Sequence, residues 1–566
     1  MKDAEKNGAV VSRPALGKRQ GDPSMVTPPN KRGAGANMKT PVSAVDKVAA
    51  NRVSMSPNKV TPHGPTTTPI NIITYNERKN AGQVMVTFNP NNLPPISEAT
   101  DSKTQKCVVS CSFDTNVTKP YRHMFTTLEE RANALDNHLN KMGEKMVERY
   151  EIGKDDGIAA FEAVGVPRQD EVCCIGRICN EAHEGRINQT SVVLEGSKHT
   201  AGGKRVNVDL SELQSSKTSF SLFPGQIVAV EGMNVSGRKM VAHRICEGAA
   251  HAPTKSTVEQ LLHYHYTTQD GKPLKLINMC GPYTTSDNLD YEPLTDMLEV
   301  IRAEKPDVVI MAGPFVDMRH ALVASGNTSL EAEDGTKLIV SHEAFFANKV
   351  AALIEELFVS EEDLNTQFVL VPSLDDAVAE WVYPQAPLTD RLPNGGKAVN
   401  LPNAEGIEFG TLGIHHIDNV GGEGLSDDET FTRVHRMSNP CTLKINELVI
   451  GVTSTDILFH LNADETNGNL EPGSRLGRIA QHLLQQQSFY PLFPPPANSA
   501  MAANLDLKHM DQWSMPCQPD LLIVPSKLTC FARTVLDETV VVNPGHLARG
   551  TTGGSYAIME VHPIKR

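Results

Sequence analysis

The spacing of hydrophobic residues divides the chain into four stretches. Residues 1–105 show no sustained hydrophobic period and are rich in Pro, Asn, Thr, Gly and Lys, which is typical of a disordered segment. Residues 118–163 carry a helical pattern instead. Thr126 or Thr127 can cap this helix, with Glu129 and Glu130 in its first turn. One apolar stripe follows and predicts a single face packed on a neighbouring domain; it consists of Leu128, Ala132, Leu135, Leu139 and Met142.

Residues 170–248 contain short runs with strand propensity separated by turn signals. The predicted strands are 172–178, 191–195, 205–210, 226–232 and 240–246. Five strands over about 80 residues are typical of an OB barrel. Many OB folds bind single-stranded nucleic acid through aromatic side chains over a basic groove. Only Phe220 and Phe223 stand out here, and the basic loop at 202–205 is small, so the pattern favours a domain that docks protein.

Residues 255–566 alternate between apolar strands and amphipathic helices. The predicted strands include 274–279, 308–312, 368–371, 448–452, 521–524 and 539–542, and the helices include 294–301, 346–357 and 476–484. This alternation predicts a layered α/β domain. Ligand sites in such domains lie at the carboxyl ends of strands, so the loops that follow these strands decide the function.

The predicted fold class is therefore a multidomain protein with a disordered tail, a β OB barrel and an α/β domain. Its expected boundaries are 1–105 for a regulatory tail, 106–168 for a helical or extended connector, 169–250 for the OB domain and 251–566 for the α/β domain. A length of 566 residues is too great for one core.

Charge and cysteine usage narrow the function classes. Residues 1–80 hold 13 Lys and Arg against 5 Asp and Glu, a net charge of +8. The whole chain has a net charge of −14, so residues 81–566 carry −22. An acidic body argues against a broad nucleic-acid surface and fits contacts with other proteins. The ten cysteines form no C-x-x-C pair, which argues against a structural zinc site and fits a reducing compartment. No apolar run is long enough for a membrane span, and no signal-peptide core is present.

The loops after three strands resemble those of a dismantled metal site. They contain Cys280, Gly281 and Pro282; then Gly313, Pro314 and Asp317; then Ser526 and Lys527. A two-metal hydrolase needs a bridging carboxylate and several hard or imidazole ligands. One surviving aspartate, with Asp287, Asp375 or Asp376 nearby, cannot hold such a centre, so no catalytic residue, metal or other cofactor is expected.

The remaining polar residues have plain interpretations. Asp317 is interpreted as a loop-capping acceptor. The histidines are interpreted as surface or satisfied core residues; they are His342, His415, His416, His460 and His546.

Five phrases in a fixed order carry a family resemblance. They are the residues 280–288, 313–317, 451–461, 490–495 and 542–545, beginning with Cys-Gly-Pro-Tyr-Thr-Thr-Ser and including Gly-Val-Thr-Ser-Thr-Asp. Over roughly residues 105–566 the chain resembles the accessory B-subunit family of replicative DNA polymerases, and within it the members that belong to DNA polymerase alpha. The family's small N-terminal globular module is not evident in residues 1–105.

The resemblance implies an OB domain joined to a calcineurin-like phosphoesterase domain that has lost its metals. An active phosphoesterase would have a bridging carboxylate where this chain has Pro314, an Asn-His pair at Pro372, Ser373 and Leu374, and late histidines where Ser526 and Lys527 stand. The implied function is a non-catalytic scaffold of the polymerase alpha–primase complex. It would bind the zinc-bearing C-terminal domain of the catalytic subunit, meet the primase subunits through the complex, support replication initiation and primer synthesis, and contact DNA indirectly or weakly.

Three alternatives stay open at this point. The chain could be the small subunit of another replicative polymerase, an active metallophosphoesterase, or a single-strand binder acting through its OB domain. The motifs of the polymerase alpha type argue against another polymerase, and Pro314 argues against an active phosphoesterase. The net charge of −22 after residue 80 argues against a single-strand binder.

The tail carries candidate regulatory sites. Five Ser/Thr-Pro steps occur, and the candidate phosphosites are Thr27, Ser56 and Thr61. Lys18 and Arg19, followed by Lys31 and Arg32, resemble a bipartite nuclear-import signal, which predicts a nuclear location.

Overall fold

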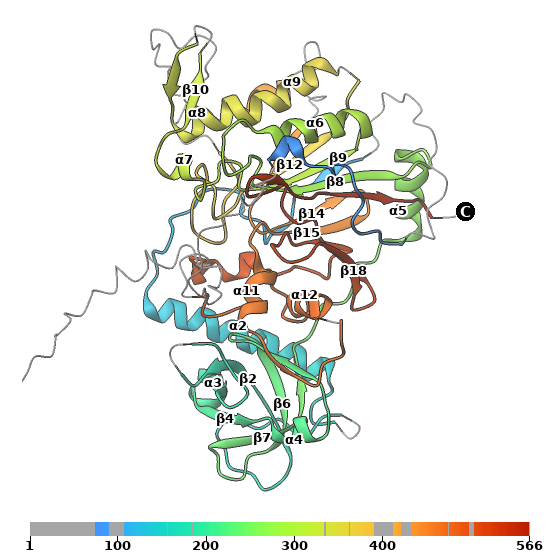
Figure 1. Ribbon diagram of the computed structural model, residues 1–566. Coiled ribbons are helices and arrows are strands. Elements are labelled where there is room, and N and C mark those ends of the chain that lie inside the picture. The colour runs from blue at the N-terminus through green and yellow to red at the C-terminus, as the bar shows by residue number, and fades with distance from the viewer. Residues whose placement is uncertain are drawn as a thin grey trace, which may run out of the picture. The chain divides into compact units, whose positions relative to one another are not determined.

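The computed structural model describes residues 74–89, 107–154, 157–182, 185–332, 335–361, 363–389, 411–419, 432–473, 475–496 and 503–564 (Figure 1). The candidate phosphosites and import residues lie outside these ranges; they are Thr27, Ser56, Thr61, Lys18, Arg19, Lys31 and Arg32. Among the described residues, none of the helices combines the length and the apolar composition that a bilayer crossing requires.

Helix α2 (Leu128–Arg149) begins at the predicted cap. The Glu130 backbone N–H donates to Thr127 Oγ1 at 3.2 Å, and the Thr127 N–H donates to Glu130 Oε2 at 2.7 Å. This reciprocal pair satisfies two amides that a helix end otherwise leaves without partners. The capping prediction is confirmed, although the helix is shorter than the stretch 118–163.

The predicted apolar stripe of α2 is wrong in its first turn. Leu128 is 81% exposed and Ala132 is also exposed. The packed face begins at Leu135, which contacts the core of the α/β domain, and continues with Leu139 and Met142 against the barrel. Helical spacing identifies residues that share a face, but it does not tell where the neighbouring surface ends.

The OB strands close into a barrel in the order β2-β3-β4-β7-β6. Their bounds are Val172–Asn180, Val192–Glu195, Arg205–Asp209, Lys239–Cys246 and Ile227–Met233, which confirms the five predicted strands. Alternation along β2 sends Cys174 and Ile178 into the barrel and Cys173 and Ile175 outward. Helix α2 covers this outward face with Leu139, Met142 and Met146 (Figure 1).

The α/β domain contains two packed sheets. The first has the order β13-β12-β9-β8-β22, and the second has the order β1-β14-β15-β17-β19-β18. Strands of the first sheet are Val434–Arg436, Gln367–Val371, Val308–Ala312, Leu274–Cys280 and Ala557–Val561. Strands of the second are Val109–Ser110, Cys441–Ile445, Leu448–Val452, Leu521–Ile523, Thr539–Asn543 and Phe531–Val535. Strands β8, β9, β12 and β13 run parallel, as do β15, β17 and β19.

Helices cover the outer faces of both sheets. Residues such as Ile310 and Val371 face Leu443 and Ile450 between the sheets. Helices α6 (Glu292–Glu304), α8 (His342–Phe346) and α9 (Ala352–Ser360) pack on the first sheet, and α11 (Ile457–Asp464) and α12 (Arg475–Gln485) pack on the second. Figure 1 shows the resulting four layers one above the other.

Short elements complete the chain. They are η1 (Tyr75–Glu77), α3 (Lys198–Ala201), α4 (Ser211–Ser215), α5 (Val258–Leu262), η3 (His263–Thr268), α7 (Ala321–Ala324), β10 (Ser329–Glu331), β11 (Lys337–Ile339), η4 (Ala347–Ala351), α10 (Ile414–Asn419), η5 (Leu507–Trp513), β20 (Ala548–Arg549) and β21 (Thr552–Gly553). Strand β5 (Phe220–Leu222) of the OB region pairs antiparallel with β16 (Thr466–Gly468) of the α/β domain. One small ladder therefore belongs to both domains.

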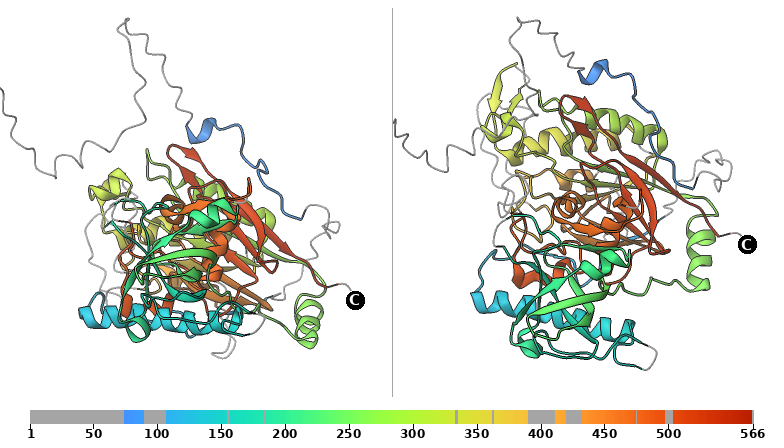
Figure 2. Two further views of the ribbon diagram at one scale, coloured as in Figure 1. Left: turned by 90° about the horizontal axis from the view of Figure 1, so that it is seen from below. Right: turned by 60° about the horizontal axis from the view of Figure 1, so that its bottom comes forward.

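Residues 74–89, which fall within the predicted tail, are described and are coloured blue in Figure 2. Tyr75 in this segment has a relative exposure of 7% and donates to Asp296 of α6. A single aromatic anchor in a polar stretch produces no hydrophobic period, so the sequence pattern did not reveal it.

Candidate functional site: the strand-end loops

Two of the singled-out loops, those after β8 and β9, lie side by side at the carboxyl ends of these parallel strands. Gly281, after β8, donates its N–H to Ala312 O at 2.8 Å, and Gly313, after β9, donates to Val371 O at 2.8 Å. A Cβ on Gly281 would lie 2.0 Å from Pro314 O, and one on Gly313 would lie 2.7 Å from an Asp376 carboxylate oxygen. Both glycines are therefore required by close packing of the loops, without any chemical role.

Cys280 and Pro314 are part of this packed layer. The Cys280 side chain is completely buried, and its thiol donates to Gly313 O at 3.2 Å. Burial raises the pKa of this thiol well above its usual range, so the sulfur is a protonated donor and not a thiolate ligand. Pro314 has no polar atom on its side chain and occupies the loop directly before Phe315.

The buried Asp376 side chain holds the loop after β9 in place through hydrogen bonds. Its two carboxylate oxygens accept the backbone N–H groups of Phe315 at 2.9 Å and Val316 at 3.0 Å. Burial raises the pKa of Asp376 to about 7, although these hydrogen bonds act in the opposite direction. Asp317 forms a bridge with Asp376 through the backbone and caps its own loop, because its Oδ1 accepts the Arg319 N–H at 2.8 Å.

Neutral amide and hydroxyl side chains join the two sheets. Asn439 donates to Gln385 Oε1 at 2.7 Å, and its Oδ1 accepts from Thr453 Oγ1 at 3.0 Å and from the Ser454 N–H at 3.1 Å. Gln385 in turn donates to Ser373 O at 2.9 Å. Ser373 was among the residues singled out from the sequence. Asn439 and Gln385 were missed, because their partners lie far away along the chain.

The loop after β17 is held in the same way. The Ser526 N–H donates to Asn543 Oδ1 at 2.8 Å, and Ser526 Oγ accepts from the Leu528 N–H at 3.1 Å. The Lys527 N–H donates to Asp456 Oδ2 at 2.9 Å, and Asp456 also caps α11 by accepting the Phe459 N–H at 3.1 Å. The backbone N–H groups of residues 526–528 thus all have hydrogen-bond acceptors within the protein.

Charged groups at the rim are balanced by cations of the chain itself. Arg319 Nη2 lies 2.8 Å from Asp375 Oδ2. Burial raises the pKa of Asp375, and the positive charges of Arg319 and Lys527 oppose that rise. Asp287, by contrast, is exposed in the loop that precedes α6, and it is not part of this cluster.

The two histidines nearest these loops are neutral. Burial lowers the pKa of His460 to about 4, and its Nδ1 lies 3.0 Å from the Tyr490 hydroxyl. Burial also lowers the pKa of His546, whose Nδ1 donates to Gly281 O at 2.6 Å. His342 is half-buried in α8, and His415 and His416 contact each other in α10. Among the described residues, no group of three or more His, Cys, Asp or Glu side chains is placed to hold a metal ion.

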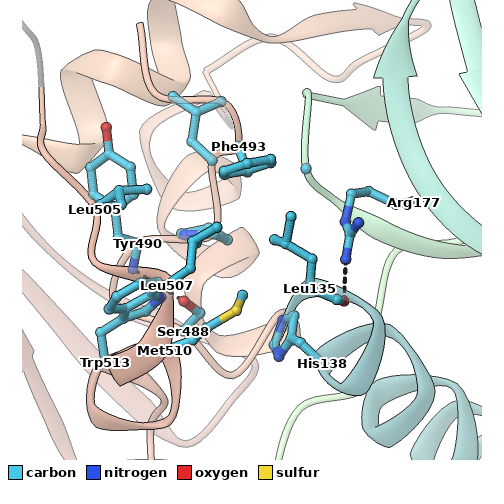
Figure 3. A pocket seen from close by; sticks show the side chains of 13 residues that line it. Leu135, His138, Arg177, Ser488, Tyr490, Phe493, Leu505, Leu507, Met510 and Trp513 are labelled. Atoms are coloured by element: carbon cyan, nitrogen blue, oxygen red, sulfur yellow. Dashed lines mark hydrogen bonds between the residues drawn. The ribbon is translucent and has the colours of Figure 1, made fainter. Parts of the chain in front are cut away.

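A small pocket lies where α2, the barrel and the α/β domain meet. It has a volume of roughly 10 Å³, about enough for one water molecule, and its lining includes Leu135, His138, Arg177, Tyr490, Phe493, Met510 and Trp513 (Figure 3). Arg177 of β2 donates to Leu135 O of α2, which ties the barrel to the helix. Burial lowers the pKa of His138 to about 4, with Arg177 adding to the shift, so the pocket wall carries a neutral imidazole.

Comparisons with known proteins agree with this two-domain arrangement. A family model for the OB domain of the DNA polymerase alpha B-subunit matches residues 132–248, and a model for the DNA polymerase alpha/epsilon B-subunit matches residues 276–533. The DNA polymerase alpha B-subunit of Rattus norvegicus is 32% identical over 486 residues, which cover 85% of this chain and 68% of the relative. The chain belongs to the DNA polymerase alpha B-subunit family.

More distant members of the family match to a similar extent. The DNA polymerase alpha B-subunit of Schizosaccharomyces pombe is 28% identical over 490 residues, covering 86% of this chain and 75% of the relative. Its counterpart in Saccharomyces cerevisiae is 28% identical over 522 residues, covering 85% and 67%. The OB model of the family starts within α2, in agreement with the packing of this helix on the barrel.

Proposed function

We propose that this chain is a non-catalytic accessory subunit of the nuclear DNA polymerase alpha–primase complex. It binds the C-terminal domain of the catalytic subunit, meets primase through the complex, and supports replication initiation and primer synthesis. The observation that carries this proposal is the match across both domains to relatives named as B-subunits of DNA polymerase alpha. The predicted phosphorylation of Thr27, Ser56 or Thr61 and import through the basic pairs belong to the same proposal.

We further propose that the α/β domain is a calcineurin-like phosphoesterase that has lost its metals. The four-layer arrangement with loops at the strand ends supports this origin. Pro314 cannot bridge two metals, and the neutral Asn439 network joins the two sheets through hydrogen bonds. Arg319 and Lys527 supply the positive charge near Asp375, so the loops are balanced without a bound cation.

The OB barrel is a docking module in this proposal, not a single-strand binder. Phe220 and Phe223, the two conspicuous aromatic residues, are 1% and 0% exposed and cannot stack on bases. On the outer face of β3 and β4, Arg205 is paired with Glu195. The loop between β2 and β3 contacts the α/β domain, since Gln189 donates to Asn467 O of that domain at 3.0 Å. DNA contact by this domain is therefore expected to be indirect or weak.

The pocket in Figure 3 is our candidate for part of the docking surface. Aromatic and aliphatic side chains from three elements converge there, and partner anchors usually insert into such junctions. Met510 is half-buried at this site and packs against the core of the α/β domain, so an arginine there would block an apolar anchor, and circular dichroism checks that the variant still folds. Val235, which is 57% exposed on the barrel loop between β6 and β7, provides a matched control.

Co-purification of the full chain with the C-terminal domain of the polymerase alpha catalytic subunit, across a salt series, tests the proposal. A salt-resistant one-to-one complex is expected, with weakening by Met510→Arg but not by Val235→Arg. Because one matching model is described as alpha/epsilon, the corresponding domain of polymerase epsilon is the competitor. Preference for the epsilon domain would overturn the assignment to alpha. Stoichiometric manganese together with phosphodiester hydrolysis would overturn the non-catalytic assignment.

A further inference from the structure

Residues 74–89 contact the α/β domain through the short turn from Thr74 to Arg78. Within this segment Tyr75 is buried and Arg78 is half-buried, while the other residues are exposed. In the second half, Val84 and Met85 are 74% and 72% exposed, and Val86 and Phe88 are 46% and 36% exposed. The turn therefore contains the most deeply buried residue of the segment.

Helix α6 receives this turn through two acidic side chains. The Tyr75 hydroxyl donates to Asp296 Oδ2 at 2.9 Å, and Arg78 forms an ion pair with the same oxygen. Asn76 donates to Glu292 Oε1 at 2.7 Å, one helical turn earlier. Burial and the neighbouring Asp296 raise the pKa of Tyr75, so the hydroxyl is a donor at every physiological pH.

The turn also packs closely against β21. The Arg78 guanidinium lies 3.6 Å from the centre of the Tyr75 ring, and its Nη1 donates to Tyr75 O at 2.7 Å. A Cβ added to Gly553 in β21 would lie 3.2 Å from the Tyr75 ring and 3.3 Å from Arg78. The absence of a side chain at Gly553 therefore leaves room for the stacked pair.

We propose that α6 and β21 form a peptide-recognition groove for the sequence Tyr-x-x-Arg, and that residues 74–78 are its resident ligand. One carboxylate, Asp296, reads both side chains, because it accepts from a hydroxyl and pairs with a guanidinium. Glu292 adds a contact to the residue between them. These contacts hold residues 75–78 on α6.

Hydrogen exchange in the full-length protein tests the attachment in place. The amides of Glu77 and Arg78, which donate to Thr74 O and Tyr75 O, report on the turn. Tyr75→Ala or Asp296→Arg is expected to speed their exchange about tenfold or more. Arg78→Asp combined with Asp296→Arg restores the ion pair but not the acceptor of the Tyr75 hydroxyl, so it is expected to restore part of the protection. Asp511→Arg, at an exposed acid of another ion pair, is the control and leaves the exchange unchanged.

Binding in trans tests recognition by the groove. Full-length Tyr75→Ala protein has lost its resident anchor, so a fluorescent peptide of residues 74–88 is expected to bind it. The same peptide with Arg78→Asp is expected to bind about tenfold more weakly, and to recover part of its affinity when the protein also carries Asp296→Arg. Unchanged exchange after Tyr75→Ala and Asp296→Arg would overturn the proposal. Failure of the peptide to bind at about 1 mM would also overturn it, because short tethers supply effective concentrations of that order.

Discussion

The strand-end loops and the junction between the barrel and the α/β domain are both rich in buried polar groups, but they use them differently. At the junction, Glu465 is 1% exposed and accepts from Arg478 Nε and Nη2 at 2.9 Å each, and from the Ser221 hydroxyl. Burial alone would raise the pKa of Glu465, but its bonds to His482, Arg478 and Ser221 hold that pKa well below its usual range. At the strand ends, Asn439 and Asn543 carry the network, and both are neutral.

This difference distinguishes charged groups that stabilise the fold from charged groups that could take part in catalysis. The junction keeps a fully paired carboxylate because its partners come from two domains and fix their register. A hydrolase would need unpaired carboxylates and imidazoles facing an open metal position. In the loops of this chain the asparagine amides are hydrogen-bonded and the two nearby histidines have lowered pKa values. The aspartates there accept backbone N–H groups or, in the case of Asp375, pair with Arg319. A dense cluster of polar side chains therefore indicates catalysis or metal binding only when some of its donors or acceptors have no partner within the protein.

The strongest test of this contrast is Arg478→Met. The substitution leaves the Glu465 carboxylate buried without its bidentate partner, so we expect the free energy of unfolding to fall by about 3–5 kcal/mol. Urea denaturation followed by circular dichroism measures the change. The double variant with Glu465→Gln removes both charges and is expected to recover part of the loss. A cost under about 1 kcal/mol would show that the ion pair is not structural.

The next effect is a pH dependence that belongs to Asp376. Its pKa is about 7 in the folded chain, above the ordinary value of 3.8, so between these values the folded state binds the extra proton. Stability is therefore greatest below about pH 4 for this group and is lost as the pH rises toward 7, by roughly 2–4 kcal/mol. Asp317 and Asp375 have raised pKa values and add slopes of the same sign.

Asp376→Asn isolates the contribution of this one carboxyl group. Unfolding free energies of wild type and variant, measured at pH 5 and pH 8, should show a smaller decrease in the variant. Equal decreases in the two proteins would place the pKa of Asp376 near its ordinary value.

Asn439→Ala tests the neutral network directly. The variant removes both halves of the amide and leaves the Ser454 N–H and the Gln385 carbonyl oxygen buried without partners, at a cost of about 1–3 kcal/mol. Thermal and urea unfolding measure this cost, and the affinity for added manganese should stay undetectable. Asn439→Asp serves as the matched variant, since it adds a potential ligand of the same shape. Tight manganese binding by that variant would mean that the loops are one residue from a metal site.

Local patterns predicted the barrel strands, the cap of α2 and the apolar strands that the singled-out loops follow. They did not predict that the α/β domain has two sheets, because β1 pairs Val109 with Ile445 from a distant part of the chain. For the same reason Asn439 was missed, since its partner Gln385 follows a different strand. Pro314 was recognised early because a ligand position occupied by proline is visible in the sequence itself. Packing partners are not visible in this way.

The smallest expected effect comes from a charge pair outside both regions. Lys141 on α2 and Asp511 in η5 lie 2.9 Å apart, but their side chains are 61% and 86% exposed. Water and salt screen such a pair, so Lys141→Ala should change the free energy of unfolding by no more than about 0.5 kcal/mol. The same assay that measures Arg478→Met provides this value under identical conditions. The shortest N–O distance is 2.9 Å in both pairs, but the Arg478–Glu465 pair is buried and bidentate, whereas the Lys141–Asp511 pair is exposed and has a single contact. A cost for Lys141→Ala comparable to that of Arg478→Met would mean that neither burial nor bidentate geometry sets the strength of these contacts.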